Sequence, residues 1–310
     1  MSEAPAAEHT WLWQGHRIHW TRSGAASAGP LVVLIHGFGA SVEHWRHNQN
    51  VLAQQGEVFA LDLLGFGASD KPRSYLADEA AEPGAVRYCF DLWAQQVVDF
   101  LAEVAQAGGR PVHLIGNSIG GMVALDAAVL LSEASRPPAQ VILIDCAQRT
   151  LDEKRVAQLP PLERASRPAV KALVRQRWLI APLFRFLARP AFIRQVLRQA
   201  YPSGANVDEE LVALLYRPST DPGATESFRG FVNLFEDHLA PDLLAKLQVP
   251  VRMIWGAEDP WEAPTEARRW RDTYSCIKAL EVLPGVGHCP HDELPEAVNP
   301  LLLNWINAAG

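Results

Sequence analysis

Short runs of wholly apolar residues recur along the chain and constrain its fold more than any other feature. They lie at 31–35, 58–61, 112–115, 141–144, 251–255 and 279–283. Strands that are buried on both faces of a parallel sheet have such sequences. Helical patterns separate the runs, as at 91–105, where apolar residues repeat at helical spacing. This alternation predicts an α/β protein with a mostly parallel, doubly wound sheet. A β-hairpin is expected at 11–21, around Gln14-Gly15.

The alternation of strands and helices stops after Asp145 and resumes at Val251. From Gln148 to Ala240 the chain has only helical stretches interrupted by prolines. The window 151–200 holds eleven Lys and Arg but three Asp and Glu, so it carries +8 while the rest of the chain carries −15. Because two signals mark one segment, we expect a helical cap at 148–240, inserted into a core formed by 1–147 and 241–310.

Composition excludes several classes of protein. The chain of 310 residues is 48% apolar and 20% charged, which is ordinary for a globular protein. Its net charge of −7 argues against a nucleic-acid-binding protein. No apolar run could span a bilayer, and the first ten residues do not resemble a targeting signal. The four cysteines form no CxxC pair, so we expect a reducing compartment and a cytoplasmic protein.

The strongest local motif is Gly116-Asn117-Ser118-Ile119-Gly120, directly after the apolar run 112–115. A serine between a strand and a helix, with glycines two residues to either side, is typical of a nucleophile on a strained turn. The small glycines remove side chains that would collide with adjoining strands. The sequence therefore predicts Ser118 as a nucleophile.

A serine hydroxyl needs a base, and His288 is the best candidate among ten histidines. It follows the last predicted strand in Pro284-Gly285-Val286-Gly287-His288, as the chain order Ser…Asp…His requires. The acid that orients it is expected to be Asp259, just after the run 251–255. Glu258 and Asp145 are the rival acids.

Backbone amides are expected to bind the developing oxyanion. One is the N–H of Ile119, after the nucleophile, and the other is the N–H of Phe38, in the turn 36–39 after the first buried strand. The glycine-rich turns lack the spacing and the lysine of phosphate-binding loops. His288, Cys289 and His291 are too close in sequence to chelate a metal well, so neither a metal nor a cofactor is expected.

With these residues in place, the chain resembles the α/β-hydrolase family over nearly its whole length. The segments HGFG at 36–39, DLLGFGASDKP at 62–72, GNSIGG at 116–121 and GVGH at 285–288 carry this resemblance. HGFGASVEHWR, DLLGFGASDKP and WGAEDPW also resemble hydrolases of photosynthetic organisms related to pheophytinase. Haloalkane dehalogenases and epoxide hydrolases of the family use an aspartate nucleophile, where this chain has Ser118. C–C bond hydrolases typically have tryptophan directly after the histidine, where this chain has Cys289.

The sequence thus predicts a serine hydrolase that cleaves the carboxylic ester of a bulky apolar molecule. A C–C bond hydrolase, a cofactor-free perhydrolase and a non-catalytic binding protein on the same scaffold remain alternatives. Substrate contacts are expected from Trp261, Trp178 and Phe184. The cap combines apolar residues at 178–184 with arginines, so it is expected either as an ordinary lid or as a surface that rests on an anionic membrane. An acidic partner or an anionic substrate would also fit the basic excess.

Overall fold

The computed structural model describes residues 6–25 and 29–308 and shows an eight-stranded sheet. Residues 1–5, 26–28 and 309–310, which the sequence analysis assigned to the core, lie outside the described residues. The strand order is β1-β2-β4-β3-β5-β6-β7-β8. In chain order, the strands are β1 Ala7–Trp13, β2 His16–Ser23, β3 Leu31–Ile35, β4 Glu57–Leu61, β5 Val112–Asn117, β6 Gln140–Ile144, β7 Val251–Gly256 and β8 Ile277–Leu283. Every apolar run that predicts a strand lies in this sheet.

The first two strands form the expected hairpin, and the rest of the sheet is parallel. β1 pairs with β2, and β2 with β4, in antiparallel fashion, whereas β3 to β8 pair in parallel. Gln14 and Gly15 form the turn with φ angles of 49° and 83°. Two-residue hairpin turns require this left-handed backbone because it matches the twist of the strands. The mostly parallel, doubly wound sheet is confirmed.

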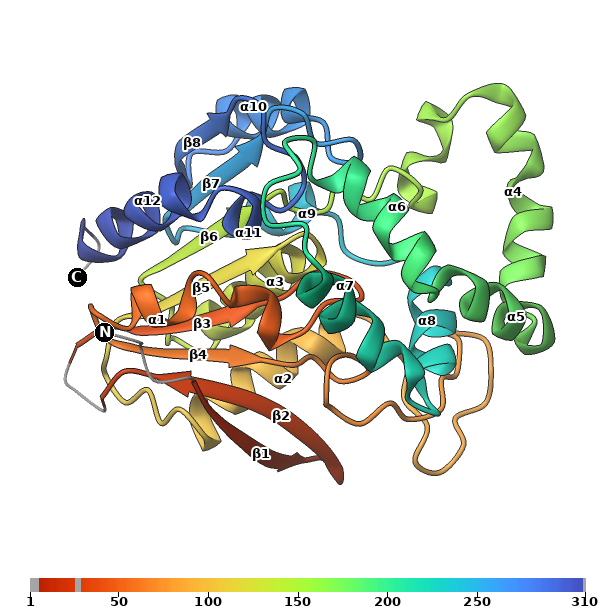
Figure 1. The fold of residues 1–310 in the computed structure, drawn as a ribbon, viewed down its shortest axis with the longest axis horizontal. Helices are drawn as coiled ribbons and strands as arrows, with labels where there is room; N and C mark the ends of the chain where they lie inside the picture. The colour runs from red at the N-terminus through yellow and green to blue at the C-terminus, as the bar shows by residue number, and fades with distance from the viewer. Residues whose placement is uncertain (1–5, 26–28, 309–310) are drawn as a thin grey trace.

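Helices cover both faces of the sheet (Figure 1). Alternate residues of β3 show the division: Leu31, Val33 and Ile35 pack with α2 (Phe90–Glu103), α3 (Ile119–Glu133) and α10 (Pro264–Thr273). Val32 and Leu34 pack on the other face with α1 (Gln49–Leu52) and α12 (Pro295–Ala308). Because successive side chains of a strand point to opposite faces, a strand covered on both sides is wholly apolar.

Between β6 and β7, the described residues form helices and no strand. Figure 1 shows α4 to α8 gathered at one side of the sheet. These elements are η2 Glu153–Gln158, α4 Pro161–Val174, α5 Arg177–Leu187, α6 Pro190–Ala200, α7 Glu209–Tyr216, η3 Arg217–Thr220, α8 Ala224–Val232 and α9 Ala240–Leu244. Prolines occur at the first turn or inside several of them, where they begin or bend the helices.

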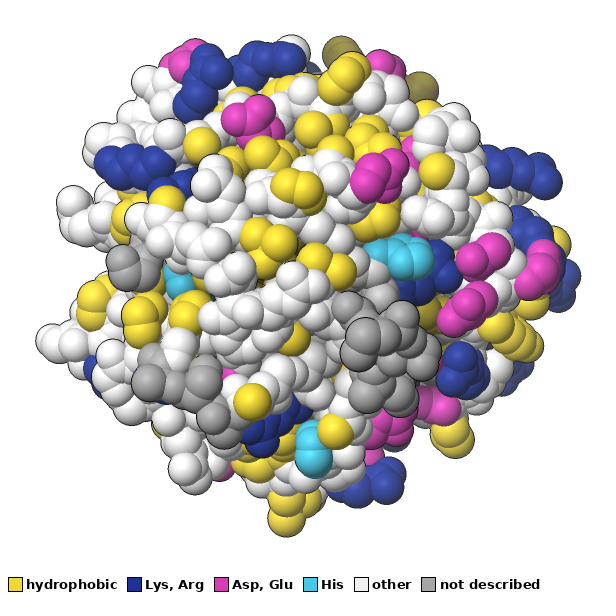
Figure 2. All heavy atoms as spheres, turned by 60° about the vertical axis from the view of Figure 1, so that its left-hand side comes forward, with side chains coloured by type: hydrophobic (Ala, Val, Ile, Leu, Met, Phe, Trp, Pro, Cys, Tyr) yellow, Lys and Arg dark blue, Asp and Glu magenta, His cyan; other side chains and the backbone are white. Residues whose placement is uncertain are grey.

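The surface away from this helical segment carries mixed charge. Figure 2 shows Lys and Arg side chains spread singly around the edge of this face, among Asp and Glu. On this face there is no basic stripe of the kind that binds nucleic acid. In the part of the chain that the structure describes, no helix is long and apolar enough to cross a bilayer.

Candidate active site

Ser118 lies on a sharp turn between β5 and α3, with φ 55° and ψ −121°. Left-handed backbone is strained for a residue with a side chain, and such strain persists only where the surroundings enforce it. The Ser118 N–H donates to the Ile144 carbonyl at the end of β6, which holds the turn against the sheet. Its side chain lies at the N-terminus of α3, where unpaired backbone N–H groups favour negative charge.

Two glycines make this turn possible. A Cβ atom on Gly116 would lie 2.1 Å from the Gly120 carbonyl oxygen, and one on Gly120 would lie 2.2 Å from the Ile35 carbonyl oxygen. Gly120 therefore avoids an adjoining strand, as expected from the sequence. Gly116 instead avoids the first turn of α3, because the chain reverses so sharply that strand and helix backbones touch.

The loop after β3 lies directly beside Ser118. A Cβ atom on Gly37 would lie 2.9 Å from the Asn117 Oδ1 and 3.2 Å from the Ser118 Cβ, so glycine favours this close approach of the loop. His36 fixes the loop: its Nδ1 lies 2.7 Å from the Gly37 carbonyl, and its Nε2 accepts from the Leu63 N–H at 3.1 Å. Among the described residues, the N–H groups of Phe38 and Ile119 have no recorded hydrogen-bond acceptor. Both are thus available to an oxyanion beside Ser118.

His288 and Asp259 are brought together by the loops after β8 and β7. The His288 Nδ1 lies 2.8 Å from the Asp259 Oδ2, and both side chains are buried. The Asp259 Oδ1 accepts from the N–H groups of Trp261 and Glu262 at 2.9 and 3.1 Å. A carboxylate held in this way fixes the tautomer of the imidazole and leaves Nε2 free to accept a proton.

Asp145, a rival acid, lies next to Asp259 but does not hold the ring. The ligand atoms of Asp145, Asp259 and His288 lie within 4.8 Å of one another. Burial and the charge of Asp259 raise the pKa of Asp145 well above its ordinary value, which favours a protonated side chain. Burial also acts to raise the pKa of Asp259, but hydrogen bonds with His288 and Asp145 outweigh it and lower that pKa. The two shifts thus favour a proton on Asp145 and an ionised Asp259.

Glu258, the other rival, makes no recorded hydrogen bond with His288 in the described part of the chain. Asp259 is thus the only one of the three candidate acids that the described residues show bonded to the ring.

Ser118 and His288 line one pocket, which also contains Phe38 and Asn117. The described residues show no hydrogen bond between the Ser118 hydroxyl and the His288 ring. Such contacts are often long before a substrate binds. The helical segment closes the pocket with a largely apolar wall, formed by Val196, Leu197, Ala200, Tyr201, Leu215 and Phe231.

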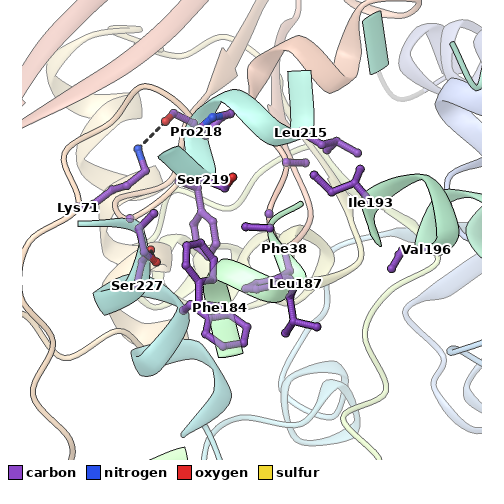
Figure 3. A pocket seen from close by; sticks show the side chains of 18 of the residues that line it. Phe38, Lys71, Phe184, Leu187, Ile193, Val196, Leu215, Pro218, Ser219 and Ser227 are labelled. Atoms are coloured by element: carbon purple, nitrogen blue, oxygen red, sulfur yellow. Dashed lines mark hydrogen bonds between the residues drawn. The ribbon is translucent and has the colours of Figure 1, made fainter. Parts of the chain in front are cut away.

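A second, more apolar pocket adjoins the first (Figure 3). Five residues line both pockets: Phe38, Ala40, Val196, Leu197 and Leu215. The Phe38 ring stacks on Phe231 with centroids 4.0 Å apart, at the junction between them. Figure 3 shows Lys71 at one side of the second pocket, opposite Ile193 and Val196. The Lys71 amine donates to the carbonyls of Gly67 and Ser69 and pairs with Asp221, so the pocket offers no free cation from this residue.

The three expected substrate contacts have different positions. Trp261 lines the pocket of Ser118, and its ring meets that of His288 edge to face at 4.9 Å. Phe184 lines the second pocket and contacts Phe228. Trp178 lines neither pocket and is 72% exposed. The structure therefore does not bring Trp178 to either pocket, and its contact with a substrate stays a prediction.

Sequence reasoning missed two polar groups at the site. The Asn117 amide donates to the carbonyls of Ile144 and His288, so it ties the serine turn to the histidine loop. Glu262 lines the pocket and accepts from the Gln148 N–H at 2.7 Å. Burial raises the pKa of Glu262 to about 7. The motif itself could have indicated Asn117, whereas the surroundings of Glu262 come from distant parts of the chain.

Residues 32–301 match the Alpha/beta hydrolase family. The chain belongs to this family. The mostly parallel eight-stranded sheet is the part of the structure that corresponds to this fold.

Particular relatives differ in chemistry. The chain is 27% identical to "Pheophytinase, chloroplastic" of Arabidopsis thaliana over 94% of its length, and it spans 64% of that protein. It is 24% identical to the 2-hydroxy-6-oxo-6-(2'-aminophenyl)hexa-2,4-dienoic acid hydrolase of Metapseudomonas resinovorans, over 93% of this chain and 87% of that protein. The solved structure of the epoxide hydrolase CorEH superposes with a TM-score of 0.74, at 21% identity, over 99% of this chain and all of that one. At that identity the superposition shows the fold alone.

Proposed function

We propose that this hydrolase cleaves carboxylic esters that carry a bulky apolar group, with Ser118 as nucleophile. The observation that carries the proposal is the strained serine in one pocket with a histidine whose ring is bonded to a buried carboxylate. This constellation activates a hydroxyl that is otherwise a weak nucleophile.

The geometry supports a two-step reaction. His288 takes the proton of Ser118 as the hydroxyl oxygen attacks the ester carbonyl. The N–H groups of Phe38 and Ile119 bind the oxyanion, and Asp259 stabilises the imidazolium. His288 then gives its proton to the leaving alcohol oxygen, and the acyl group stays on Ser118. A water molecule, deprotonated by His288, hydrolyses this acyl-enzyme and releases the acid.

The pockets favour a neutral, apolar substrate. In both pockets, Lys71 is the only lining lysine or arginine among the described residues, and its amine is already bound. The dienoic acid that names the Metapseudomonas relative carries a carboxylate, for which these pockets offer no cation. Rings of Phe184 and Phe228, with Leu187 and Ile193, suit an alkyl or polycyclic group instead.

A fluorophosphonate probe tests the nucleophile. We expect the probe to label the wild-type chain at one serine and to leave Ser118→Ala unlabelled. Hydrolysis of p-nitrophenyl esters should fall about 10⁴-fold in this variant, as for other triad deletions. Ser275→Ala, at an exposed serine away from the pockets, is the matched control and should behave as the wild type. Labelling of Ser118→Ala at the wild-type rate would contradict the assignment, and an unlabelled wild type would indicate a binding protein.

Chain length tests the substrate class. Among p-nitrophenyl esters from acetate to palmitate, kcat/KM should rise as the acyl group begins to fill the second pocket. Phe184→Ala should reduce this gain for long esters and leave acetate hydrolysis nearly unchanged, because Phe184 lies only in the second pocket. A preference for acetate in the wild type would contradict the proposed substrate class.

A further inference from the structure

The helices α4 and α5 expose an unusual amount of apolar surface. Of the eleven large apolar side chains that are exposed among the described residues, six lie between Leu162 and Phe186. Scattered exposed apolar residues are ordinary on a soluble protein, but a contiguous patch marks an interaction site. Figure 1 shows both helices at the end of the molecule farthest from β8 and α12.

α4 carries its apolar residues on the side away from the core. Leu162, Val170 and Leu173 are 81%, 47% and 54% exposed. Arg167 is the one residue of α4 that is buried: its guanidinium lies 5.1 Å from the Phe235 ring, and it pairs with Glu153. The helix is thus anchored by an arginine and presents its leucines outward, the reverse of the usual arrangement.

α5 is apolar on both sides. Phe184 and Leu187 line the second pocket. Trp178, Leu183 and Phe186 are 72%, 41% and 51% exposed. Packing against the core requires only one apolar side, so the outer one has no role within the described chain.

Unpaired cations lie on α4 and α5 and on α6, which follows them. Arg164, Arg185, Arg189 and Arg198 are exposed and have no ion-pair partner among the described residues. The guanidinium of Arg189 lies 5.4 Å from the Phe186 ring. Glu163 is the one acid between 151 and 200 without a recorded ion pair, so the unpaired charge there is strongly positive.

We propose that the outer face of α4 and α5 binds an anionic lipid bilayer. Exposed Leu and Trp side chains would enter the interface while the arginines contact lipid phosphates, the combination that holds proteins on anionic membranes. The charge decides against a second copy of this chain, because a two-fold interface would place the same unpaired arginines against one another. Where the ester hydrolysis proposed above also holds, α5 separates the bilayer from the second pocket, so the substrates include apolar esters dissolved in that bilayer.

Co-sedimentation with vesicles tests the binding. The full chain should bind vesicles of 70% phosphatidylcholine and 30% phosphatidylglycerol in low salt, and at least tenfold more weakly at 0.5 M NaCl. It should not bind pure phosphatidylcholine measurably. Absence of binding to the anionic vesicles in low salt would overturn the proposal.

Paired variants locate the surface. Leu162→Ser/Leu173→Ser and Arg185→Glu/Arg189→Glu should each weaken vesicle binding at least tenfold. Leu12→Ser, at a residue 68% exposed on β1, and Arg268→Glu, at an exposed residue of α10, are the controls and should bind as the wild type. Equal binding by all four variants would overturn the proposal. A dimer in the wild type that dissociates in Leu162→Ser/Leu173→Ser, without vesicle binding, would assign the face to a second copy instead.

Labelling by the fluorophosphonate separates the two proposals. Vesicle binding without labelling would leave the surface assigned and contradict the ester hydrolysis. Labelling without vesicle binding would support the nucleophile and contradict the membrane surface.

Discussion

Asp145 and Asp259 are chemically identical side chains whose surroundings shift their pKa values in opposite directions. Asp259 accepts hydrogen bonds from two backbone N–H groups and from the His288 ring. Asp145 is fully buried, accepts from the Gly256 N–H and shares a hydrogen bond with the Asp259 carboxylate. Two adjacent carboxylates cannot both ionise readily, so the less solvated one keeps its proton.

This division predicts different effects of the same substitution. Asp259→Asn should reduce kcat/KM for a p-nitrophenyl ester by about 10³- to 10⁴-fold, since an amide stabilises the wrong tautomer of His288. Asp145→Asn should change it less than about tenfold, because the Asn amide can donate to Asp259 as a protonated carboxyl does. The reverse ranking would assign the acid to Asp145.

Glu262 provides a test by pH. Its pKa is raised from 4.5 to about 7, mainly by burial, so the folded chain retains a proton there that the unfolded chain loses. Between these pH values the folded state binds more protons, and stability therefore falls as pH rises. The side chain of Glu262→Gln is neutral at every pH, so this variant does not lose stability in this way as pH rises. The difference in melting temperature, Glu262→Gln minus wild type, should be larger at pH 8 than at pH 5. A constant difference would show that Glu262 ionises normally.

The sequence predicted the individual site residues unevenly. Ser118 and His288 were predictable because strand ends and chain order restrict where a nucleophile and its base can lie. The choice of Asp259 over Asp145 depended on that order alone, although both acids reach the same place. Glu262 was not predictable, because its pKa depends on burial and on the Gln148 N–H, more than a hundred residues away.

At the scale of elements, the turn between β5 and α3 determines where the site forms. It brings the Gly120 backbone so near to Ile35 that no side chain fits between them. The loop after β3 reaches Ser118 only because of this close approach.

Gly120→Ala should therefore prevent the turn from forming. The added Cβ would lie 2.2 Å from a backbone oxygen, and neither strand nor helix can move without breaking the sheet. We expect loss of fluorophosphonate labelling and a drop in stability of more than about 2 kcal/mol, as for other overpacked sites. Gly109→Ala has open space around its Cβ and no left-handed φ, so it should match the wild type. Unchanged labelling in Gly120→Ala would contradict this account of the turn.

α3 and α5 show why element positions were easier to predict than their faces. In α3, Met122, Leu125 and Val129 recur at helical spacing, which by itself indicates one apolar face. The structure buries twelve of its fifteen residues, since α9, a hundred residues later, covers it in addition to α2. The same holds for Trp178 on α5: local spacing gives the period of a helix, but distant contacts decide which side turns inward.

On the scale of the whole molecule, a polar network ties the helical segment to the core beside the site. The Tyr201 hydroxyl donates to Asp292 at 3.0 Å and lies 2.9 Å from the His44 Nε2. Arg46 bonds both Asp292 and Asp208. Sequence patterns indicated the boundaries of the segment, but this attachment depends on side chains from four separate elements.

Burial of His44 makes the attachment sensitive to acid. Burial lowers its pKa from 6.5 to about 4. Between pH 4 and pH 6.5, His44 is therefore mostly protonated in the unfolded chain and mostly neutral in the folded chain. Stability is therefore lost as pH falls through this window, by about 2 kcal/mol at pH 5. His44→Gln stays neutral and should lose about that much less on acidification from pH 7 to pH 5, as measured by urea unfolding. An equal loss in both chains would exclude His44 as a source of acid sensitivity.

The helical segment leaves the sheet after β6 and returns in β7, its direct neighbour. Ser118 precedes the segment, whereas Asp259 and His288 follow it. Any crossover that joins two adjacent parallel strands satisfies the sheet, whatever its length or composition. Evolution can therefore replace these roughly ninety residues as one unit and so change the substrate preference or the docking surface. The geometry of the reacting groups is set by the strands and would stay the same.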